Sequence, residues 1–263
     1  RLNFSHGKAE DHIARANQIR EAAQLVGRPV GILADMQGPK IRVGKFEEGK
    51  ITLTKDAAFI LDAALTTPGN LHRVGLDYKD LPRDVKPGDV LLLDDGRLKL
   101  SVDRVLGHEI HTRVKVGGEL SNNKGINRQG GGLTAPALTA KDMDDIKTAA
   151  LIGVDFVAIS FPKGAADMYM ARQLLRAAGS SALLIAKIER TEAVANLEEI
   201  LDASDGIMVA RGDLAVEVGD ATVPALQKRM IRLARERNKL AITATQMMES
   251  MIHSPVPTRA EVS

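Results

Sequence analysis

The chain has 263 residues, 44% hydrophobic and 27% charged, which is enough for one large α/β domain or a domain with an insertion. Its net charge of +2 gives no indication of a nucleic-acid or membrane partner, and the aromatic content of 3%, without Trp, argues against base stacking. No cysteine is present, which excludes disulfides and thiolate metal sites and fits a cytoplasmic protein. No apolar run approaches the ~20 residues of a membrane helix.

The first part of the chain predicts a helix and then a buried strand. Apolar residues at helical spacing run from about His6 to Val26, and the apolar stretch VGILAD follows at residues 30–35. The Gly-Pro of MQGPK then ends that strand. We assign residues 1–40 to the first part of a barrel domain.

From residue 41 to residue 132 the pattern changes to short alternating segments separated by turn signals. The stretch LLLDDGRLKL is typical of a β-hairpin with Asp95 and Gly96 at its turn. We predict that this segment is a small antiparallel β-domain inserted into the larger one. Gly130 to Gly132 precede neither a Lys-Ser/Thr pair nor a helix start, so we interpret them as a hinge that leaves the insertion. His108 and His111 lie in an alternating strand and are predicted to be on the surface.

Strands and helices alternate in the rest of the chain, residues 133–263, which we assign to the second part of the barrel domain. A helix is expected after Thr139, the predicted N-cap, with Asp142 completing a variant of the capping box. Helices are also expected at residues 167–178, 191–201 and 223–238. The apolar stretches between them, VDFVAISF, LLIAKIE, GIMVARGD and KLAITATQ, predict parallel strands joined by crossover helices.

The polar residues at the strand ends favour a barrel over an open doubly wound sheet. A barrel builds its site from the carboxyl ends of successive strands, whereas an open sheet concentrates it at one switch point. Such residues follow every predicted strand of the larger domain: Asp35, Ser160, Lys187 with Glu189, Arg211 with Asp213, and Thr245 with Gln246. We therefore predict an α/β fold of the TIM type, incomplete in this chain.

The stretch IAKIER places Lys187 and Glu189 on one face of a buried strand, because side chains alternate along a strand. Taken alone, the pair is best interpreted as a structural ion pair. Asp213 follows the next strand, however, and Mg²⁺ is typically held by one or two carboxylates together with substrate oxygens. Lys187 would then neutralise a phosphate or an oxyanion, and the amides near Gly212 would suit an anionic group. Thr245 alone is better interpreted as a strand-end hydroxyl.

The motifs of the chain, taken together and in order, resemble the pyruvate kinase family and most of all its bacterial members. They are RLNFSHG, DMQGPKIR, LSNNKGIN, FVAISFP, AKIER, MVARGDLAVE, ATQMMESM and PTRAEV. The resemblance implies a (β/α)₈ barrel with the β-domain inserted after the third strand. It also implies a glycolytic transferase that moves a phosphoryl group from phosphoenolpyruvate to ADP, giving pyruvate and ATP.

The chain begins without Met and ends at PTRAEVS without a closing element, so we expect a fragment. By the resemblance, the fragment lacks the N-terminal start, the end of the barrel and the C-terminal domain. We expect this chain alone to be inactive, and we expect the full-length protein to form a homo-oligomer, a tetramer by the family pattern. Nucleic acid and membrane are not expected partners.

The resemblance also implies roles for individual residues. Catalysis is expected from Lys187, Thr245 and Arg1. The substrate site is expected to contain Arg1, Ser160, Lys187, Gly212, Asp213 and Thr245. The nucleotide site is expected to contain Asn3, Phe4, Ser5, His6, Arg42 and Lys124. Glu189 and Asp213 are the expected ligands of Mg²⁺ or Mn²⁺, and the monovalent-cation site of the family matches Asn3, Ser5, Asp35 and Met36.

Three residues depart from the family pattern. Ala215 replaces a Gly, Met36 replaces a Thr common in cation-dependent members, and Lys40 stands where members that need K⁺ carry an acidic residue. K⁺ is therefore possible by family but predicted not to be required, because the Lys40 ammonium would replace the cation beside Asp35. The alternative interpretation is a solvated Lys40 and a site that binds K⁺.

Two other functions stay open at this point. Metal-dependent barrel lyases that act on pyruvate or phosphoenolpyruvate also carry acidic metal ligands at strand ends. The inserted β-domain and the SNNKG stretch argue against that class, and an ADP requirement would exclude it. The other possibility is a non-catalytic fragment that only binds ligand or folds.

Overall fold

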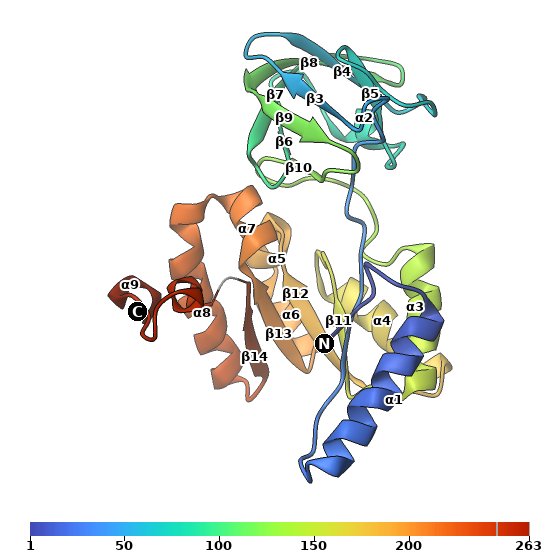
Figure 1. Ribbon diagram of the computed structural model, residues 1–263, viewed down its shortest axis with the longest axis vertical. Helices are drawn as coiled ribbons and strands as arrows, with labels where there is room; N and C mark the ends of the chain where they lie inside the picture. The colour runs from blue at the N-terminus through green and yellow to red at the C-terminus, as the bar shows by residue number, and fades with distance from the viewer. Residues whose placement is uncertain (246, 263) are drawn as a thin grey trace.

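A computed structural model describes residues 1–245 and 247–262 of the chain. It has two regions, an α/β region and a β-region joined to it by two passes of the chain (Figure 1). The core of the α/β region is a six-stranded parallel sheet with the strand order β1-β2-β11-β12-β13-β14. Its strands are β1 (Leu2–Asn3), β2 (Leu33–Asp35), β11 (Phe156–Ile159), β12 (Leu183–Ile188), β13 (Gly206–Ala210) and β14 (Leu240–Ala244).

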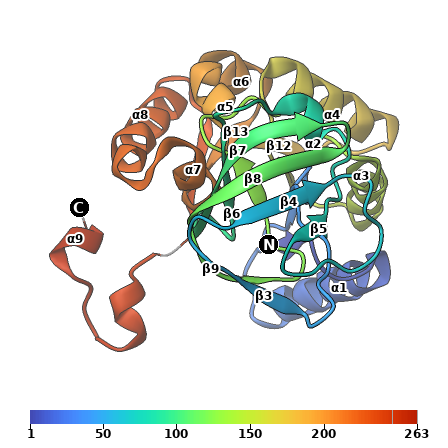
Figure 2. The same ribbon diagram turned by 90° about the horizontal axis from the view of Figure 1, so that it is seen from above.

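The sheet curls as part of a barrel, and its helices form an arc around the outer side (Figure 2). They are α1 (Ala9–Leu25), α3 (Ala140–Ile152), α4 (Ala165–Ala177), α5 (Thr191–Ala195), α6 (Leu197–Ala203), α7 (Arg211–Val218) and α8 (Val223–Glu236). Two 3₁₀ helices, η1 (Asp220–Thr222) and η2 (Glu249–Ile252), and the short helix α9 (Arg259–Val262) complete the set. None of the helices in the described part of the chain has the length and apolar character needed to cross a membrane.

Strand alternation divides the apolar residues of the sheet between two cores. On β12, Leu184, Ala186 and Ile188 pack outward against the helices, in the larger hydrophobic core of the region. Ile185 points to the inner face, where it packs with Ala158 and Met208. Residues two apart share a face, so Lys187 continues the inner row of Ile185. The prediction of a buried strand with Lys187 on its inner face is confirmed, although β12 ends at Ile188 and Glu189 follows it.

The β-region contains strands β3 to β10 around a separate hydrophobic core. Its larger sheet has the order β10-β6-β7-β8-β4-β5, and β3 pairs with β9. The elements are β3 (Lys50–Leu53), β4 (Ala58–Asp62), β5 (Arg73–Gly75), α2 (Leu81–Asp84), β6 (Val90–Leu93), β7 (Leu98–Leu106), β8 (Glu109–Val116), β9 (Gly118–Ser121) and β10 (Ile126–Arg128). The predicted hairpin is β6–β7, paired antiparallel. Its turn is longer than predicted, with Asp94, Asp95 and Gly96 all at positive φ.

Several predicted elements end earlier or divide. The stretch GIMVARGD is a strand only to Ala210, because helix α7 begins at Arg211. Strand β14 ends at Ala244, and Gln246 lies outside the described residues. The helix expected at residues 191–201 is two helices, α5 and α6, with a break at Asn196 whose side-chain amide donates to the Lys163 carbonyl at 2.8 Å.

Candidate active site

The candidate site lies where the parallel strands of the α/β region end, on the side that faces the β-region (Figure 1). Asp35 ends strand β2, Ser160 follows β11, and Glu189 follows β12. Asp213 lies in the first turn of α7, directly after β13, and Thr245 follows β14. The carboxyl ends of parallel strands meet at one edge of a sheet, so side chains from distant parts of the chain converge there.

Lys187 is the centre of the site. Its side chain is only 13% exposed, and its Nζ lies 3.0 Å from Glu189 Oε1 and 3.1 Å from Asp35 Oδ1. The same ammonium donates to Ser160 Oγ at 2.7 Å. Burial alone would lower the pKa of Lys187, but the Glu189 and Asp35 carboxylates outweigh it and raise that pKa. Lys187 is therefore held as a cation among acceptors.

Glu189 is fully enclosed, with 1% of its surface exposed. Burial raises its pKa to about 7, against the opposing charge of Lys187, and the negative charge of Asp213 adds to the rise. Its second oxygen, Oε2, accepts a hydrogen bond from the backbone amide of Phe161 at 2.8 Å. Phe161 has a φ of 56°, in the left-handed region, so the strand end is bent sharply where this amide meets the carboxylate.

Ser160 and Arg1 complete the contacts of this cluster. Ser160 Oγ donates to the Met36 carbonyl at 2.7 Å, and Ser160 is buried. Arg1 Nε donates to Asp35 Oδ2 at 2.6 Å, while the Arg1 side chain stays 57% exposed. The structure thus brings Arg1, Asp35, Ser160, Lys187 and Glu189 into one connected network. The Met36 side chain is buried, and Met36 joins this network through its carbonyl oxygen, which accepts from Ser160 Oγ.

Lys40 does not lie where the sequence suggested. We expected its ammonium beside Asp35, but Nζ lies 3.2 Å from Asp213 Oδ1 and 3.8 Å from Asp95 Oδ1. The turn before it explains the difference. Gly38 has a φ of 67°, and a Cβ there would come within 2.7 Å of the Ser160 Cβ. The chain turns tightly against Ser160 and carries Lys40 towards helix α7 and the β6–β7 hairpin.

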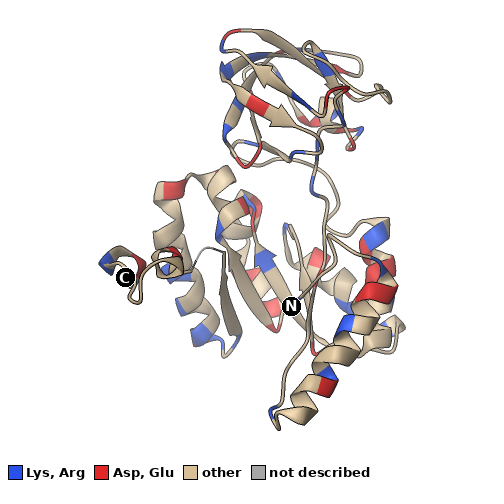
Figure 3. Ribbon diagram, viewed as in Figure 1, with Lys and Arg blue, Asp and Glu red and all other residues tan. Residues whose placement is uncertain are grey.

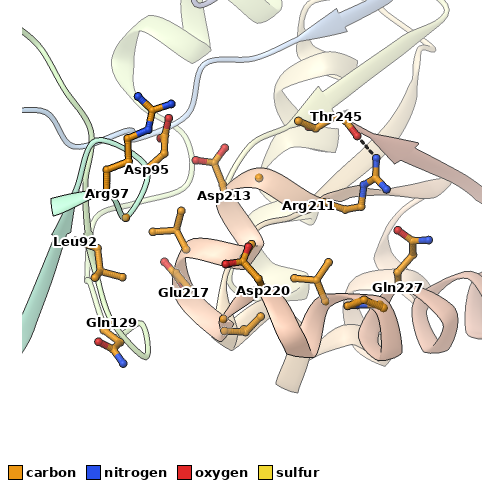
Figure 4. A pocket seen from close by; sticks show the side chains of 18 of the residues that line it. Leu92, Asp95, Arg97, Gln129, Arg211, Asp213, Glu217, Asp220, Gln227 and Thr245 are labelled. Atoms are coloured by element: carbon orange, nitrogen blue, oxygen red, sulfur yellow. Dashed lines mark hydrogen bonds between the residues drawn. The ribbon is translucent and has the colours of Figure 1, made fainter. Parts of the chain in front are cut away.

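A cleft of about 1180 Å³ opens between the β6–β7 hairpin and helices α7 and α8. Figure 4 shows Asp95 and Arg97 of the hairpin facing Asp213 and Glu217 of α7 across this cleft. Thr245 lies at its edge, with φ of 73°, and its carbonyl accepts a hydrogen bond from the Arg211 guanidinium. Lys187 and Glu189 do not line this cleft, so it extends sideways from the buried cluster along α7.

The candidate nucleotide residues form two separate groups. In the segment that follows β1, Ser5 N donates to Asn3 Oδ1 at 3.2 Å and His6 is exposed. Phe4 is buried and stacks on His12 with ring centroids 4.1 Å apart, which leaves its backbone as the part that can face a ligand.

The second group belongs to the β-region. Arg42 Nη1 donates to the Asn123 carbonyl at 3.1 Å, and Lys124 Nζ lies 2.6 Å from Asp94 Oδ1. Within the described part of the chain, no hydrogen bond or ion pair joins Arg42 or Lys124 to the segment of residues 3–6.

Some residues of the site had no role in the sequence interpretation. Asp95 was expected only to form a turn with Gly96, and Asp94 was given no role, yet Asp95 pairs with Lys40 and Asp94 pairs with Lys124. Lys141 and Asp142 lie in the first turn of α3 and contact two of the candidate segments. The sequence identified Asp142 as part of a helix cap. Nothing in the sequence indicates that Lys141 or Asp142 contacts residues more than a hundred positions away.

The carboxylates suit a hard divalent cation held partly by substrate. Among the described residues, no group of three or more His, Cys, Asp or Glu side chains has the arrangement of a complete metal site. Glu189 and Asp213 provide two carboxylates within electrostatic reach of each other. Mg²⁺ commonly takes one or two carboxylates and fills its octahedron with water and substrate oxygens. Asp35 Oδ1 is buried, and its charge is balanced by the Lys187 ammonium 3.1 Å away.

A curled parallel sheet, a charged cluster at its carboxyl edge and an attached β-region define an α/β-barrel protein whose site lies at the strand ends. The comparisons with known proteins are more specific. The family model "Pyruvate kinase, barrel domain" matches residues 1–263. The chain belongs to the pyruvate kinase family.

Individual relatives agree with this assignment. The chain is 58% identical to a pyruvate kinase of Haemophilus influenzae over all of its length and 56% of the relative's. It is also 58% identical to pyruvate kinase II of Salmonella typhimurium, of which it covers 55%. The crystal structure of a Cryptosporidium parvum pyruvate kinase is also similar, with a TM-score of 0.92 and 37% sequence identity. The match covers 99% of this chain and 55% of the chain in that structure. The chain spans about half the length of the curated relatives it matches.

Proposed function

We propose that the full-length protein transfers the phosphoryl group of phosphoenolpyruvate to ADP, giving pyruvate and ATP. One observation carries the proposal. The buried ammonium of Lys187 lies between the carboxylates of Glu189 and Asp35 at the edge where the strands end, in a chain of the pyruvate kinase family. A charged cluster of this kind is costly to bury, which is reasonable where it serves a reaction.

Phosphoryl transfer depends mainly on positioning and on neutralising charge. Lys187 suits the second task, because its neighbours raise its pKa and keep it charged. Arg1, tied to the same cluster through Asp35 and exposed at the rim, adds a second positive charge for the phosphoryl oxygens. Gly212 and Asp213 lie in the first turn of α7, where free backbone amides suit the substrate carboxylate.

Thr245 follows strand β14, and a Cβ on Gly212 would lie 3.8 Å from the Thr245 methyl group. The threonine therefore borders the first turn of α7. We propose that it lies near the substrate carbon that must gain a proton once the phosphoryl group has left. Its assignment rests on the family resemblance and on this position.

Glu189 and Asp213 would hold Mg²⁺ or Mn²⁺, which supplies positive charge to the substrate oxygens when it is bound. Each carboxylate is fixed in place by a lysine of this chain, Glu189 by Lys187 and Asp213 by Lys40. For ADP we propose the segment Asn3–His6 with Arg42 and Lys124. The monovalent-cation site would use Asn3, Ser5 and Asp35, together with the position of Met36.

We also propose three parts for the chain: residues 1–40 and 133–263 as two parts of the barrel domain, and 41–132 as the inserted β-domain. The two hydrophobic cores support the division. A homo-oligomer, a tetramer by the family pattern, is proposed for the full-length protein.

The test measures pyruvate release by the full-length protein, coupled to NADH oxidation, with phosphoenolpyruvate, ADP and Mg²⁺ and with each omitted in turn. We expect release only when all three are present. Pyruvate release at the same rate without ADP would contradict the proposal and favour a lyase or a phosphatase. ATP, measured separately with luciferase, should form in equal amount to pyruvate.

The 263-residue chain by itself should show little turnover. Its sheet has two outer strands, β1 and β14, and open parallel edges favour association with other chains. Turnover of this chain at the rate of the full-length protein, in a monomer by light scattering, would contradict this expectation.

A further inference from the structure

The first turn of helix α3 reaches two segments of the candidate site at once. Its N-cap is Thr139, and the next residues include Lys141 and Asp142. Lys141 contacts the segment that follows β1, and Asp142 contacts the turn that follows β2. The two segments carry candidate ligands for the nucleotide and the monovalent cation, but α3 itself carries none of them.

Asp142 uses its two oxygens for different tasks. Oδ2 accepts from Thr139 N at 2.9 Å and from Thr139 Oγ1 at 2.6 Å, which completes the helix cap. Oδ1 accepts from the amide of Gly38 at 3.0 Å, in a fully buried contact across 104 positions of the chain. The cap needs only Oδ2, so the bond to Gly38 is an additional function of this side chain.

The bond to Asp142 Oδ1 fixes the backbone at Gly38. The residue is in the left-handed region and touches Ser160, and Lys40 comes two positions later. A fixed amide at Gly38 therefore fixes the path from Asp35 to Lys40. Lys40 in turn reaches Asp213, so the orientation of this turn sets the charge beside a proposed metal ligand.

Lys141 acts on the neighbouring segment. Its ammonium donates to the Phe4 carbonyl at 2.7 Å and also pairs with Asp145 on the next turn of α3. Phe4 is anchored on its other side, because its side chain is buried against His12. The carbonyl bond fixes the peptide plane between Phe4 and Ser5, and the amide of that plane, Ser5 N, donates to Asn3 Oδ1 at 3.2 Å.

We propose that Lys141 and Asp142 are positioning residues. They hold the segments that follow β1 and β2 in the relative positions that nucleotide binding requires. The inference rests on the proposed function, since it assigns a role to groups behind the ADP and cation site. Neither residue touches a reacting atom. Each acts through a backbone group, the Phe4 carbonyl or the Gly38 amide, of a segment with little regular structure of its own.

The experiment compares Lys141→Met and Asp142→Asn with matched controls in the full-length protein. Asp145→Ala removes the other partner of Lys141 and leaves its bond to Phe4. Thr139→Ala weakens the helix cap and leaves the bond from Asp142 to Gly38. Each variant is measured for ADP affinity by calorimetry, for KM and kcat, for melting temperature, and for hydrogen exchange of peptides covering residues 1–8 and 36–42.

We expect Lys141→Met to weaken ADP binding and raise its KM by roughly tenfold, with a small change in kcat, because a charged hydrogen bond that fixes the binding segment is lost. Exchange in residues 1–8 should quicken. Lys141→Arg keeps a donor for the Phe4 carbonyl and should restore most of the affinity. Asp142→Asn replaces a charged acceptor with a neutral amide, which weakens the bond that Oδ1 accepts from Gly38 N and loses the one that Oδ2 accepts from Thr139 N. ADP affinity should fall by less than in Lys141→Met, with faster exchange in residues 36–42.

Thr139→Ala should lower the melting temperature without changing ADP affinity. Equal ADP affinity in Lys141→Met and wild type would overturn the proposal even if Asp142→Asn did not fold, because the Lys141 side chain is 47% exposed and its loss leaves the core intact. A wild-type protein that binds no ADP would overturn the proposed function and this role together. Normal wild-type binding with unaffected variants would overturn this role alone.

Discussion

The α/β region and the β-region bury charge in different ways. At the edge of the α/β region, the buried carboxylates Asp35 and Glu189 share the single ammonium of Lys187. In the β-region, the buried Asp62 pairs with Arg73, and Asp94 pairs with Lys124 at another place. The parallel strands of the α/β region bring their carboxyl ends to one edge. Most neighbouring strands of the β-region are antiparallel and distribute theirs over two edges, although β4 and β5, which carry Asp62 and Arg73, are parallel. The concentrated charge at the strand ends agrees with the proposed reaction site. The pairs of the β-region lie apart from one another, and one of them contains Lys124, a proposed ADP contact.

The surface follows neither pattern. Lys and Arg residues mix with Asp and Glu along helices α1 and α3 and around the β-region (Figure 3). This mixture agrees with the net charge of +2. The contrast between the two regions therefore lies in their buried groups and not in an overall charge difference.

The largest effect should come from Lys187→Met in the full-length protein. This change removes a preorganised charge at the reacting centre, and such a loss costs about 3 kcal/mol, or 10²–10³ in kcat. Substrate binding should be largely retained, which steady-state kinetics will show as a fall in kcat with a smaller change in KM. Near-normal turnover would remove Lys187 from its proposed role.

Lys50→Met is the matched control for that change. Lys50 pairs with Glu119 at 2.7 Å in the β-region and is 61% exposed, so its loss should leave turnover and stability nearly unchanged.

Glu189→Gln sharpens the comparison further. It should weaken Mg²⁺ affinity, measured by titration of activity with the metal, more than it alters turnover at saturating metal.

The next effect concerns Lys40, which connects the two regions through Asp213 and Asp95. We expect the full-length protein not to need K⁺. Lys40 does not lie beside Asp35, so its charge cannot replace the cation there and would have to act through Asp213 instead. Lys40→Glu places a third carboxylate there and should create a K⁺ requirement of roughly tenfold in turnover. The measurement is turnover against KCl, with ionic strength kept constant by tetramethylammonium.

Lys45→Glu, an exposed change nearby, should leave the K⁺ response as it is in the wild type. Strong K⁺ activation of the wild-type protein would show that the charge of Lys40 beside Asp213 does not remove the need for K⁺. If turnover of Lys40→Glu responds to KCl as the wild type does, then the charge at position 40 does not control the K⁺ requirement.

The part of the site that could be predicted from the sequence depends on strand periodicity. Alternation with period two was enough to place Lys187 and Glu189 on one face, and chain order was enough to place Asp213 after the next strand. The same reasoning predicted the larger elements of the sheet, because long apolar strands alternated with helices.

The partners of Lys40 and of Asp142 could not be predicted in this way. Each is set by the left-handed turn at Gly38 and by contacts across more than a hundred residues. Phe4 shows a second limit. Its motif suggested a ligand contact, but packing on His12 places the ring in the core. Motifs identify a segment, and tertiary packing decides which of its atoms face the site.

A core substitution in the β-region should affect stability alone. Ile110 is fully buried on strand β8, and Ile110→Val should lower the free energy of unfolding by about 1 kcal/mol with kcat unchanged. Ile185→Val removes the same group from the inner face of β12, below Lys187, and should cost a similar amount while also lowering kcat. Chemical denaturation and kinetics on both variants test this. Equal effects on kcat would remove the distinction between the regions.

The smallest effect should come from Glu217→Gln, and it should depend on pH. Glu217 lies on α7, is 7% exposed, and accepts a hydrogen bond from the Thr191 amide at 2.9 Å. Burial raises its pKa above the ordinary value of 4.5, against the opposing Thr191 bond, and the Glu192 charge adds to the rise. Because the folded pKa is the higher one, this group's contribution to stability is complete below pH 4.5 and is lost as the pH rises through the folded value.

Glutamine carries no charge at any of these pH values, so the variant avoids the desolvation of a buried carboxylate while its amide oxygen can still accept from Thr191. The melting temperature of Glu217→Gln relative to the wild type should therefore be more favourable at pH 8 than at pH 5. Glu21→Gln, an exposed change on α1, serves as the control and should give the same difference at both pH values. If the Glu217→Gln difference is also the same at both, then burial of this carboxylate does not limit stability at either pH.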